Sequence, residues 1–292
     1  MSKYWSELAN RLVPYVPGEQ HKDKTYIKLN TNENPYPPSP RVLAAIRHAV
    51  QESLRLYPDP AGQGLRQAAA RRFGLSERQV FIGNGSDEIL AFSFAAFFTP
   101  GAPVLFPDVT YSFYKVYANL YHLPYETVAL DDDFHVPLDA FHLECAGVVV
   151  PNPNAPTGKY VPVDAFRPLL EKHADHVVIL DEAYIDFGGE SAVKLIDDYP
   201  NLLVIQTLSK SRALAGLRIG MALGQEELTE GLERVKNSFN SYTLDRLARR
   251  RRWKMRTTSG RLAGTSSGRG NGRSGSSKSW GAPQSNRRRT SS

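Results

Sequence analysis

The chain has 292 residues, of which 41% are hydrophobic, so it can bury a sizeable core and we expect a soluble globular protein. No apolar run reaches the ~18 residues that a membrane helix needs, and the N-terminus lacks the apolar core of a signal peptide. A single cysteine, Cys145, excludes a disulfide framework and is typical of a reducing compartment, which favours a cytoplasmic location.

The net charge of +6 is distributed unevenly along the chain. Residues 246–292 contain 14 of the 36 Lys and Arg residues and no Asp or Glu. Residues 1–245 therefore hold 22 basic against 30 acidic side chains, a net charge of −8. Residues 1–245 are therefore acidic, and the basic isoelectric point of the whole chain does not describe them.

The N-terminal third predicts an irregular arm followed by two helices. Residues 1–38 include the segment LNTNENPYPP, which is rich in Asn and Pro and typical of loops. Apolar residues at helical spacing predict helices at 41–54, after Ser39-Pro40, and at 65–73.

From residue 79 onward short apolar runs alternate with helical or loop segments. A helix is predicted at 89–98, and strands are predicted at 80–82, 103–106, 125–129, 148–150, 177–180, 202–205 and 218–223. Continuous apolar strands of this kind indicate an α/β fold with a mostly parallel sheet between two layers of helices. Ligands in such folds bind at the carboxyl ends of the strands.

Two ionisable residues stand at predicted strand ends. Lys210 follows the run LLVIQTLS, where burial can lower the pKa of the amine and free it for a Schiff base, although a lone lysine is usually a surface residue. Asp181 follows VVIL, and a buried carboxylate needs a partner. That partner could be a protonated heterocyclic nitrogen, but a helix cap or a salt bridge is the common alternative.

Other polar residues at the same edge could hold an anion and a flat ring. The turn GNGS predicts a helix capped by Ser86, whose first amides can bind an anion, although such a turn is usually only a turn. Ser209 and Arg218 could contact the same anion, and Tyr111 could stack on a ring if it is not simply packing. With Tyr184 as a hydroxyl donor, the set meets the requirements of pyridoxal phosphate.

These motifs resemble those of the fold-type I pyridoxal-phosphate aminotransferases, and within them the histidinol-phosphate aminotransferase family. The resemblance covers residues 12–248 and rests on the stretches LVPY, LNTNENPYPP, YPDP, GNGSDE, NPNAPTG, DEAY, TLSKSRALAGLRIG and FNSYTLDRLA. It implies transamination of histidinol phosphate with 2-oxoglutarate, which becomes glutamate, in histidine biosynthesis, by a homodimer that carries pyridoxal 5'-phosphate.

The resemblance also implies roles for individual residues. Lys210 would bind the cofactor covalently and move a proton between the substrate Cα and the cofactor C4′. Asp181 would keep the ring nitrogen protonated, Tyr184 would hydrogen-bond O3′, and Tyr111 would stack on the ring. The phosphate would lie among Ser86, Asp87, Ser209, Arg218 and a Tyr57 that reaches over from the partner subunit. The substrate would lie near Tyr15 and Asn32, and no metal site is predicted.

Two features depart from the family pattern. Ala155 stands where the superfamily has an asparagine that hydrogen-bonds O3′, so that role is carried to Asn154. The family's small C-terminal domain, with its substrate-binding arginine, is replaced by a Gly/Ser/Arg-rich sequence that cannot bury a core. The expected organisation is an arm at 1–38, an incomplete cofactor-binding large domain at 39–248 and a disordered basic tail at 249–292.

The tail has two interpretations. Arginine-rich segments bind nucleic acid, so the tail could bind RNA or DNA non-specifically. Alternatively it is a frameshift product, because RRWKM back-translated with CGG arginine codons reads Ala-Val-Glu-Asp in the next frame. The second interpretation predicts impaired activity, since a lost carboxylate clamp removes a positioning contribution.

Three other functions stay open at this stage. An aromatic amino-acid aminotransferase and a threonine-phosphate decarboxylase could use the same fold. The alternative from another functional class is a non-catalytic remnant whose basic tail binds nucleic acid non-specifically.

Overall fold

The computed structural model describes residues 3–12, 28–49 and 55–238. Tyr15, residues 50–54 of the helix predicted at 41–54, and the tail at 249–292 lie outside these ranges. In the described part of the chain, no helix has the length and apolar character needed to cross a membrane.

A single mixed sheet forms the centre of the described structure. Its spatial order is β1-β7-β6-β5-β4-β2-β3. In chain order these are β1 (Val80–Gly83), β2 (Val104–Pro107), β3 (Tyr125–Val128), β4 (Gly147–Pro151), β5 (Val178–Asp181), β6 (Leu202–Thr207) and β7 (Gly220–Gly224). The strands from β6 to β3 pair in parallel, and β7 runs antiparallel to both of its neighbours, β1 and β6. The predicted mostly parallel sheet is confirmed.

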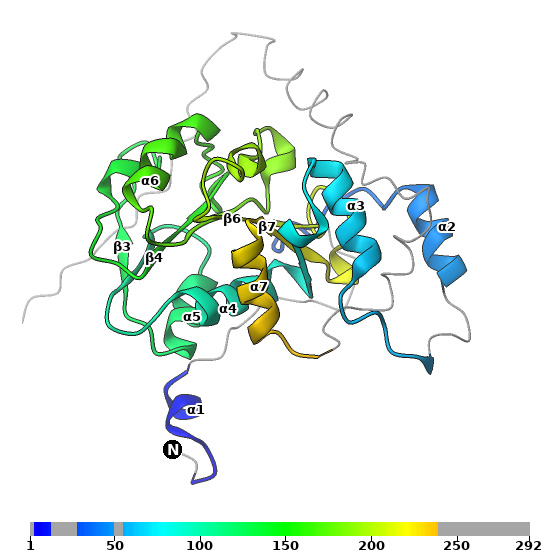
Figure 1. The fold of residues 1–292 in the computed structure, drawn as a ribbon, viewed down its shortest axis with the longest axis horizontal. Helices are drawn as coiled ribbons and strands as arrows, with labels where there is room; N and C mark the ends of the chain where they lie inside the picture. The colour runs from blue at the N-terminus through cyan, green and yellow to red at the C-terminus, as the bar shows by residue number, and fades with distance from the viewer. Residues whose placement is uncertain (1–2, 13–27, 50–54, 239–292) are drawn as a thin grey trace, which may run out of the picture.

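Helices cover both faces of the sheet, as Figure 1 shows. The helix α3 (Gln63–Phe73) and the short α6 (Arg167–Lys172) contribute to one apolar cluster. The helices α4 (Gly85–Phe97), α5 (Phe113–Leu120) and α7 (Glu226–Val235) contribute to the other.

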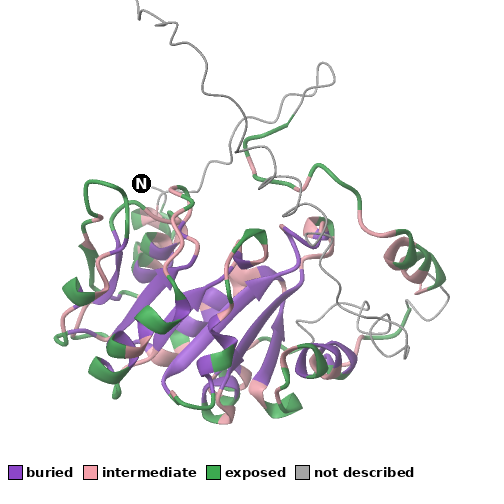
Figure 2. Ribbon diagram, turned by 90° about the horizontal axis from the view of Figure 1, so that it is seen from above, coloured by how far each residue is buried: buried purple, intermediate pink, exposed green. Residues whose placement is uncertain are grey.

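Except for the exposed edge strand β3, the strands are apolar at successive positions because each one supplies both clusters. Val178 and Leu180 of β5 belong to the α3–α6 cluster, whereas Ile179 between them belongs to the α4–α5–α7 cluster. Successive side chains of a strand point to opposite faces, so a strand covered on both faces must be apolar throughout. Figure 2 shows the result as a band of buried strands between partly exposed helices.

The described part of the N-terminal arm contains the short helix α1 (Glu7–Arg11), and α2 (Pro40–Ala49) follows the arm at the position of the predicted helix. The prediction of a wholly irregular arm is wrong at α1, because the Ser6 hydroxyl accepts a hydrogen bond from the Ala9 amide and caps the first turn. Arg11 then donates to the Asn119 carbonyl at 2.8 Å. Short 3₁₀ turns complete the described chain at η2 (Glu77–Gln79), η3 (Leu138–Ala140), η4 (Val163–Phe166), η5 (Ile185–Phe187), η6 (Ala192–Leu195) and η7 (Ala215–Leu217).

Two predicted boundaries differ from the structure near the sheet edge. The last strand begins at Gly220 and not at residue 218, because Arg218 has a left-handed backbone with φ 50° after η7. The helix α4 begins at Gly85, so Ser86 lies inside its first turn and Asn84 occupies the cap position. The prediction of Ser86 as the cap residue is therefore wrong by two positions.

The start of α4 lies directly against β7. A Cβ atom on Gly220 would stand 2.4 Å from the Gly85 carbonyl carbon and 2.6 Å from the Ser86 amide nitrogen. These are backbone atoms and cannot rotate away. Only glycine at position 220 therefore allows the helix to begin so close to the sheet.

We predict that Gly220→Ala destabilises the protein by about 1–3 kcal/mol, because the added methyl group overpacks a rigid backbone contact. Urea unfolding of the wild type and the variant measures this difference. Gly216→Ala is the matched control, since a Cβ there meets nothing within 4 Å and we expect a change below about 1 kcal/mol. Equal midpoints for the two variants would contradict the packing argument.

Candidate functional site

A cavity lies at the edge of the sheet where β4, β5 and β6 end and the chain enters β7. It is lined by eight of the residues that the sequence singled out, namely Ser86, Asp87, Tyr111, Asp181, Tyr184, Ser209, Lys210 and Arg218. Pro151, Pro153, Ala155, Ala183 and Thr207 complete the lining. Arg218 reaches the same edge because β7 runs antiparallel to β6 and so begins where β6 ends.

Asp181 ends β5 and is only 6% exposed. One carboxylate oxygen accepts a hydrogen bond from the Tyr114 hydroxyl at 2.8 Å, and the other accepts one from the Ala183 amide at 3.2 Å. Burial raises the pKa of Asp181 to about 6, although the hydrogen bond from Tyr114 works in the opposite direction. A buried carboxylate that faces a cavity favours a cationic partner there.

Lys210 lies in the turn after β6, with its amine beside the N-terminal arm. The Nζ atom donates to the Thr31 carbonyl at 3.0 Å and lies 5.6 Å from the centroid of the Tyr184 ring. The Asn34 side chain donates to the carbonyls of Lys210 and Ser211 at 3.1 and 3.2 Å. The arm therefore holds both ends of the lysine residue, its backbone and its amine.

Asn32 and Tyr184 meet on the same side of the cavity. The side-chain amide of Asn32 donates to the Tyr184 hydroxyl at 3.0 Å. These two residues also line a second pocket with Asn154, which continues from the first through the shared Pro153 and Ala155. The predicted neighbourhood of Asn32 and the cavity thus exists in the structure, while the role of Asn32 towards a substrate stays a prediction.

The start of α4 and the Thr207–Ser209 turn form a cradle with anion-binding groups. The amides of the first helical turn have no carbonyl partner within an α-helix, and Ser86 and Asp87 belong to that turn. The Thr207 hydroxyl donates to the Ser209 hydroxyl at 3.0 Å and accepts from the Ser209 amide at 3.1 Å. Arg218 adds a guanidinium to this cradle.

Asp87 joins the cradle to the aromatic side of the cavity. One of its carboxylate oxygens lies 2.9 Å from Nη2 of Arg218, and the other accepts a hydrogen bond from the Tyr111 hydroxyl at 2.7 Å. Burial raises the pKa of Tyr111 well above its ordinary value, so the hydroxyl stays a donor. The Tyr111 ring is stacked with Phe113 at a centroid separation of 5.6 Å.

Among the predicted residues that the structure describes, three do not line this cavity, namely Asn32, Asn154 and Tyr57. The Asn154 side chain donates to the Val109 carbonyl at 3.0 Å and to the Thr157 hydroxyl at 3.2 Å, so it connects two loops and lines the second pocket. Tyr57 is 77% exposed and does not line the cavity within this chain. Tyr15 lies outside the described residues.

The sequence analysis missed Tyr114 and Thr207. Tyr114 is fully buried and lies three residues after Tyr111, which is helical spacing, but nothing local indicated that its hydroxyl would meet Asp181. Thr207 ends β6, so the strand-end rule could have selected it together with Ser209.

A layer of buried polar side chains supports the turn that carries Lys210, and the sequence analysis missed this layer as well. Glu182 accepts hydrogen bonds from the Ser191 hydroxyl, the Ala192 amide and the Gln206 side chain. Burial raises the pKa of Glu182 to about 7. Gln206 in turn accepts from Arg212, which forms an ion pair with Asp186 at 3.3 Å, and Ser211 donates to the same aspartate. Except for Nε of Arg212, which has no hydrogen-bond partner among the described residues, these polar groups satisfy one another, so the turn is held from within the protein.

The comparisons with known proteins agree with this arrangement. The family "Aminotransferase class I and II" matches residues 24–249. A histidinol-phosphate aminotransferase of Clostridium beijerinckii is 60% identical over 248 residues, which cover 85% of this chain and 69% of the relative. A solved histidinol-phosphate aminotransferase of Sinorhizobium meliloti, in complex with pyridoxal-5'-phosphate, matches with a TM-score of 0.77 and 27% identity over 85% of this chain and 70% of the other.

A more distant structure shares the fold alone. The L-threonine-O-3-phosphate decarboxylase of Porphyromonas gingivalis matches with a TM-score of 0.64 and 21% identity over 73% of this chain and 65% of that one. The match to the family covers most of the chain and includes every residue that lines the cavity. The chain therefore belongs to the class I and II aminotransferase family.

Proposed function

We propose that this chain binds pyridoxal phosphate and transfers an amino group between histidinol phosphate and 2-oxoglutarate. The proposal is supported by relatives at 60–61% identity that carry the name histidinol-phosphate aminotransferase. These relatives are longer, since the chain spans about 70% of their length. The observation that carries the proposal is the meeting of Lys210, Asp181 and the cradle of α4 in one cavity.

The residues present fit such a cofactor on three grounds. The cradle offers helix-start amides, a serine hydroxyl and Arg218 to a phosphate group. At the other end, the raised pKa of Asp181 reports a buried carboxylate that a pyridinium nitrogen would stabilise. Lys210 supplies the primary amine that an aldehyde requires.

The chain's own residues then have distinct tasks. When bound, the cofactor supplies an electron sink for the charge that develops at the substrate Cα. Asp181 would hold the proton on the ring nitrogen, and Tyr114 would orient that carboxylate through its hydrogen bond. Lys210 would take the proton from the substrate Cα, and the Asn32–Tyr184 pair would border the side on which the substrate enters.

Tyr57 supports a homodimer in this proposal. Its ring is exposed and lies outside the lining of its own cavity, which is consistent with a contact to the site of a second subunit. The aromatic aminotransferase and the phosphothreonine decarboxylase remain outcomes of a substrate test. Purified protein supplied with 2-oxoglutarate and either histidinol phosphate or phenylalanine distinguishes the two transaminations.

We also propose that the tail at 249–292 is a frameshift product. The family match ends at residue 249, where the basic composition begins, and the tail itself lies outside the described residues. The alternative, a tail that binds nucleic acid, would show as specific RNA retention that is lost on truncation at Ala248.

The first prediction concerns Lys210. We expect the wild type with added pyridoxal phosphate to absorb at about 420 nm, and borohydride to fix the cofactor to Lys210. Lys210→Ala should lose both signals and at least ~10²-fold in turnover, because proton transfer by a positioned group contributes that much. Lys115→Ala, on the exposed face of α5, is the control and should keep both signals. A cofactor fixed elsewhere in the wild type would overturn the assignment.

The second prediction concerns pH. The folded-state pKa of Asp181 is raised to about 6, above the ~3.9 of an unfolded chain, so the native state binds this proton more tightly. Its contribution to stability is present at low pH and is lost as the pH rises through 6. Without cofactor, the wild type should lose roughly 1 kcal/mol relative to Asp181→Asn between pH 5 and pH 7.5. Urea unfolding of both proteins at the two pH values measures this, and an unchanged difference would refute the raised pKa.

The third prediction concerns the coding DNA. Resequencing should reveal that correcting one base near codon 249 opens a long acidic reading frame similar to the relatives. If no single-base correction does so, the basic tail is the true sequence and the frameshift proposal is wrong.

A further inference from the structure

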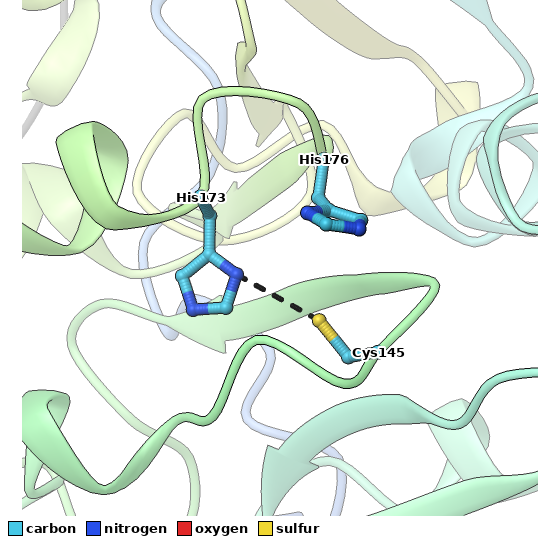
Figure 3. Close-up of side chains that lie close together, drawn as sticks. All are labelled: Cys145, His173 and His176. Carbon is cyan, nitrogen blue, oxygen red and sulfur yellow. Dashed lines mark hydrogen bonds between the residues drawn. The ribbon is translucent and has the colours of Figure 1, made fainter.

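A second cluster of reactive side chains lies at the opposite edge of the sheet. Cys145 precedes β4, while His173 follows α6 and His176 precedes β5. Figure 3 shows the three side chains facing one another from the two strand entries. One ligand atom from each lies within 4.8 Å of the others. The proposed active site lies beyond the far ends of the same two strands, so this cluster is not part of it.

The cluster is enclosed by protein. Cys145 is 4% exposed and His173 is 0% exposed, and His176 lies only half-buried. The ring nitrogen Nδ1 of His176 is buried and has no hydrogen-bond partner among the described residues. An unsatisfied buried nitrogen is costly, and a ligand between the three side chains would remove that cost.

The hydrogen bonds of His173 prepare it to act as a ligand. Its Nε2 lies 3.3 Å from the Phe141 carbonyl, and a carbonyl can only accept, so the proton belongs on Nε2. The lone pair of Nδ1 then faces Cys145 Sγ at 3.7 Å. A histidine that donates its other nitrogen to a backbone carbonyl is the usual arrangement around a bound metal.

The backbone that carries both histidines is held in place. The Asn201 side chain donates to the carbonyls of Leu170, His173 and His176 at 3.1, 2.9 and 3.3 Å. The His176 amide also donates to the His173 carbonyl at 2.9 Å. The backbone of the turn that carries both histidines is therefore preorganised.

The distances suit a tetrahedral ion with sulfur and nitrogen ligands. Zn–S bonds of about 2.3 Å and Zn–N bonds of about 2.0–2.1 Å place the two donor atoms about 3.6 Å apart at a tetrahedral angle. The observed separation of 3.7 Å between Cys145 Sγ and His173 Nδ1 agrees with this value. A water molecule would have to supply the fourth ligand, and His176 is the one member of the cluster that is partly exposed to solvent.

We propose that Cys145, His173 and His176 form a binding site for Zn²⁺ with three protein ligands. One thiolate and two imidazoles are ligands that zinc accepts, and the thiol releases its proton when it binds. The ion would connect the chain entering β4 with the turn that leads into β5. The sequence analysis predicts no metal site because Cys145 and His173 are 28 residues apart, and only the fold brings them together.

The test uses the purified full chain, cleared of metal with a chelator and titrated with Zn²⁺. We expect one zinc per chain, a higher melting temperature, and a zinc-edge X-ray absorption spectrum with one sulfur at about 2.3 Å and nitrogen or oxygen at about 2.0–2.1 Å. The chain contains a single cysteine, so a sulfur neighbour can only be Cys145 or a methionine thioether. Cys145→Ser should remove the sulfur signal.

Matched variants separate ligation from folding. Cys145→Ser and His176→Gln should each weaken Zn²⁺ binding by about 100-fold or more, while their melting temperatures without zinc stay close to that of the wild type. His142→Gln removes a neighbouring exposed histidine outside the cluster and should leave the affinity unchanged within about twofold. Equal affinity in the wild type and Cys145→Ser, or the lack of a sulfur neighbour, would overturn the proposal.

Discussion

The pairing of Gly220 with Thr207 on one side and with Gly83 on the other is the constraint on which the proposed active site depends. It fixes where the antiparallel strand begins relative to its two neighbours. Adjacent strands lie about 4.8 Å apart, so the end of β6, the start of β7 and the turn after β1 fall within about 10 Å of one another. A shift of one residue in this register would turn every side chain of β7 to the opposite face of the sheet.

The end of β5 serves two purposes because neighbouring residues of an extended chain point to opposite sides. Asp181 faces Tyr114 and the cavity, whereas Glu182 faces Gln206 and Ser191 in the buried polar layer. Burial raises the pKa of both carboxyl groups. Asp181 faces the cavity, where a ligand could pair with it, whereas Glu182 is hydrogen-bonded within the protein. The end of one strand therefore supplies both the cavity and the buried layer that supports it.

Sequence reasoning located the strands and most of the cavity because both depend on local patterns. Apolar runs such as VVIL mark strands that are buried on both faces, and polar residues just after them mark the edge at which parallel strands end. Tyr114 and Arg212 could not be found in this way. Each is polar and buried, and its partner comes from a distant segment, which only the fold specifies.

Long-range assembly also explains the errors at the boundaries. The start of α4 at Gly85 depends on close contact with Gly220, which lies 135 residues away and leaves no signal near Ser86. Arg218 looked like part of a strand because it lies in the run LRIGMAL, but its left-handed backbone ends η7 and only then does the strand begin. Cys145, His173 and His176 likewise carry no local pattern.

The ion pair between Arg218 and Asp87 bears on which anions the proposed cradle could hold. A carboxylate already occupies the guanidinium at 2.9 Å and also holds the Tyr111 hydroxyl, so an entering anion must compete with an internal one. A singly charged ion would gain little free energy by replacing the Asp87 carboxylate, because both carry one negative charge. A phosphate monoester carries close to two charges at neutral pH and offers three acceptor oxygens, enough to share Arg218 or to displace Asp87. If the cradle binds phosphate as proposed, this competition would favour a doubly charged group over a singly charged one.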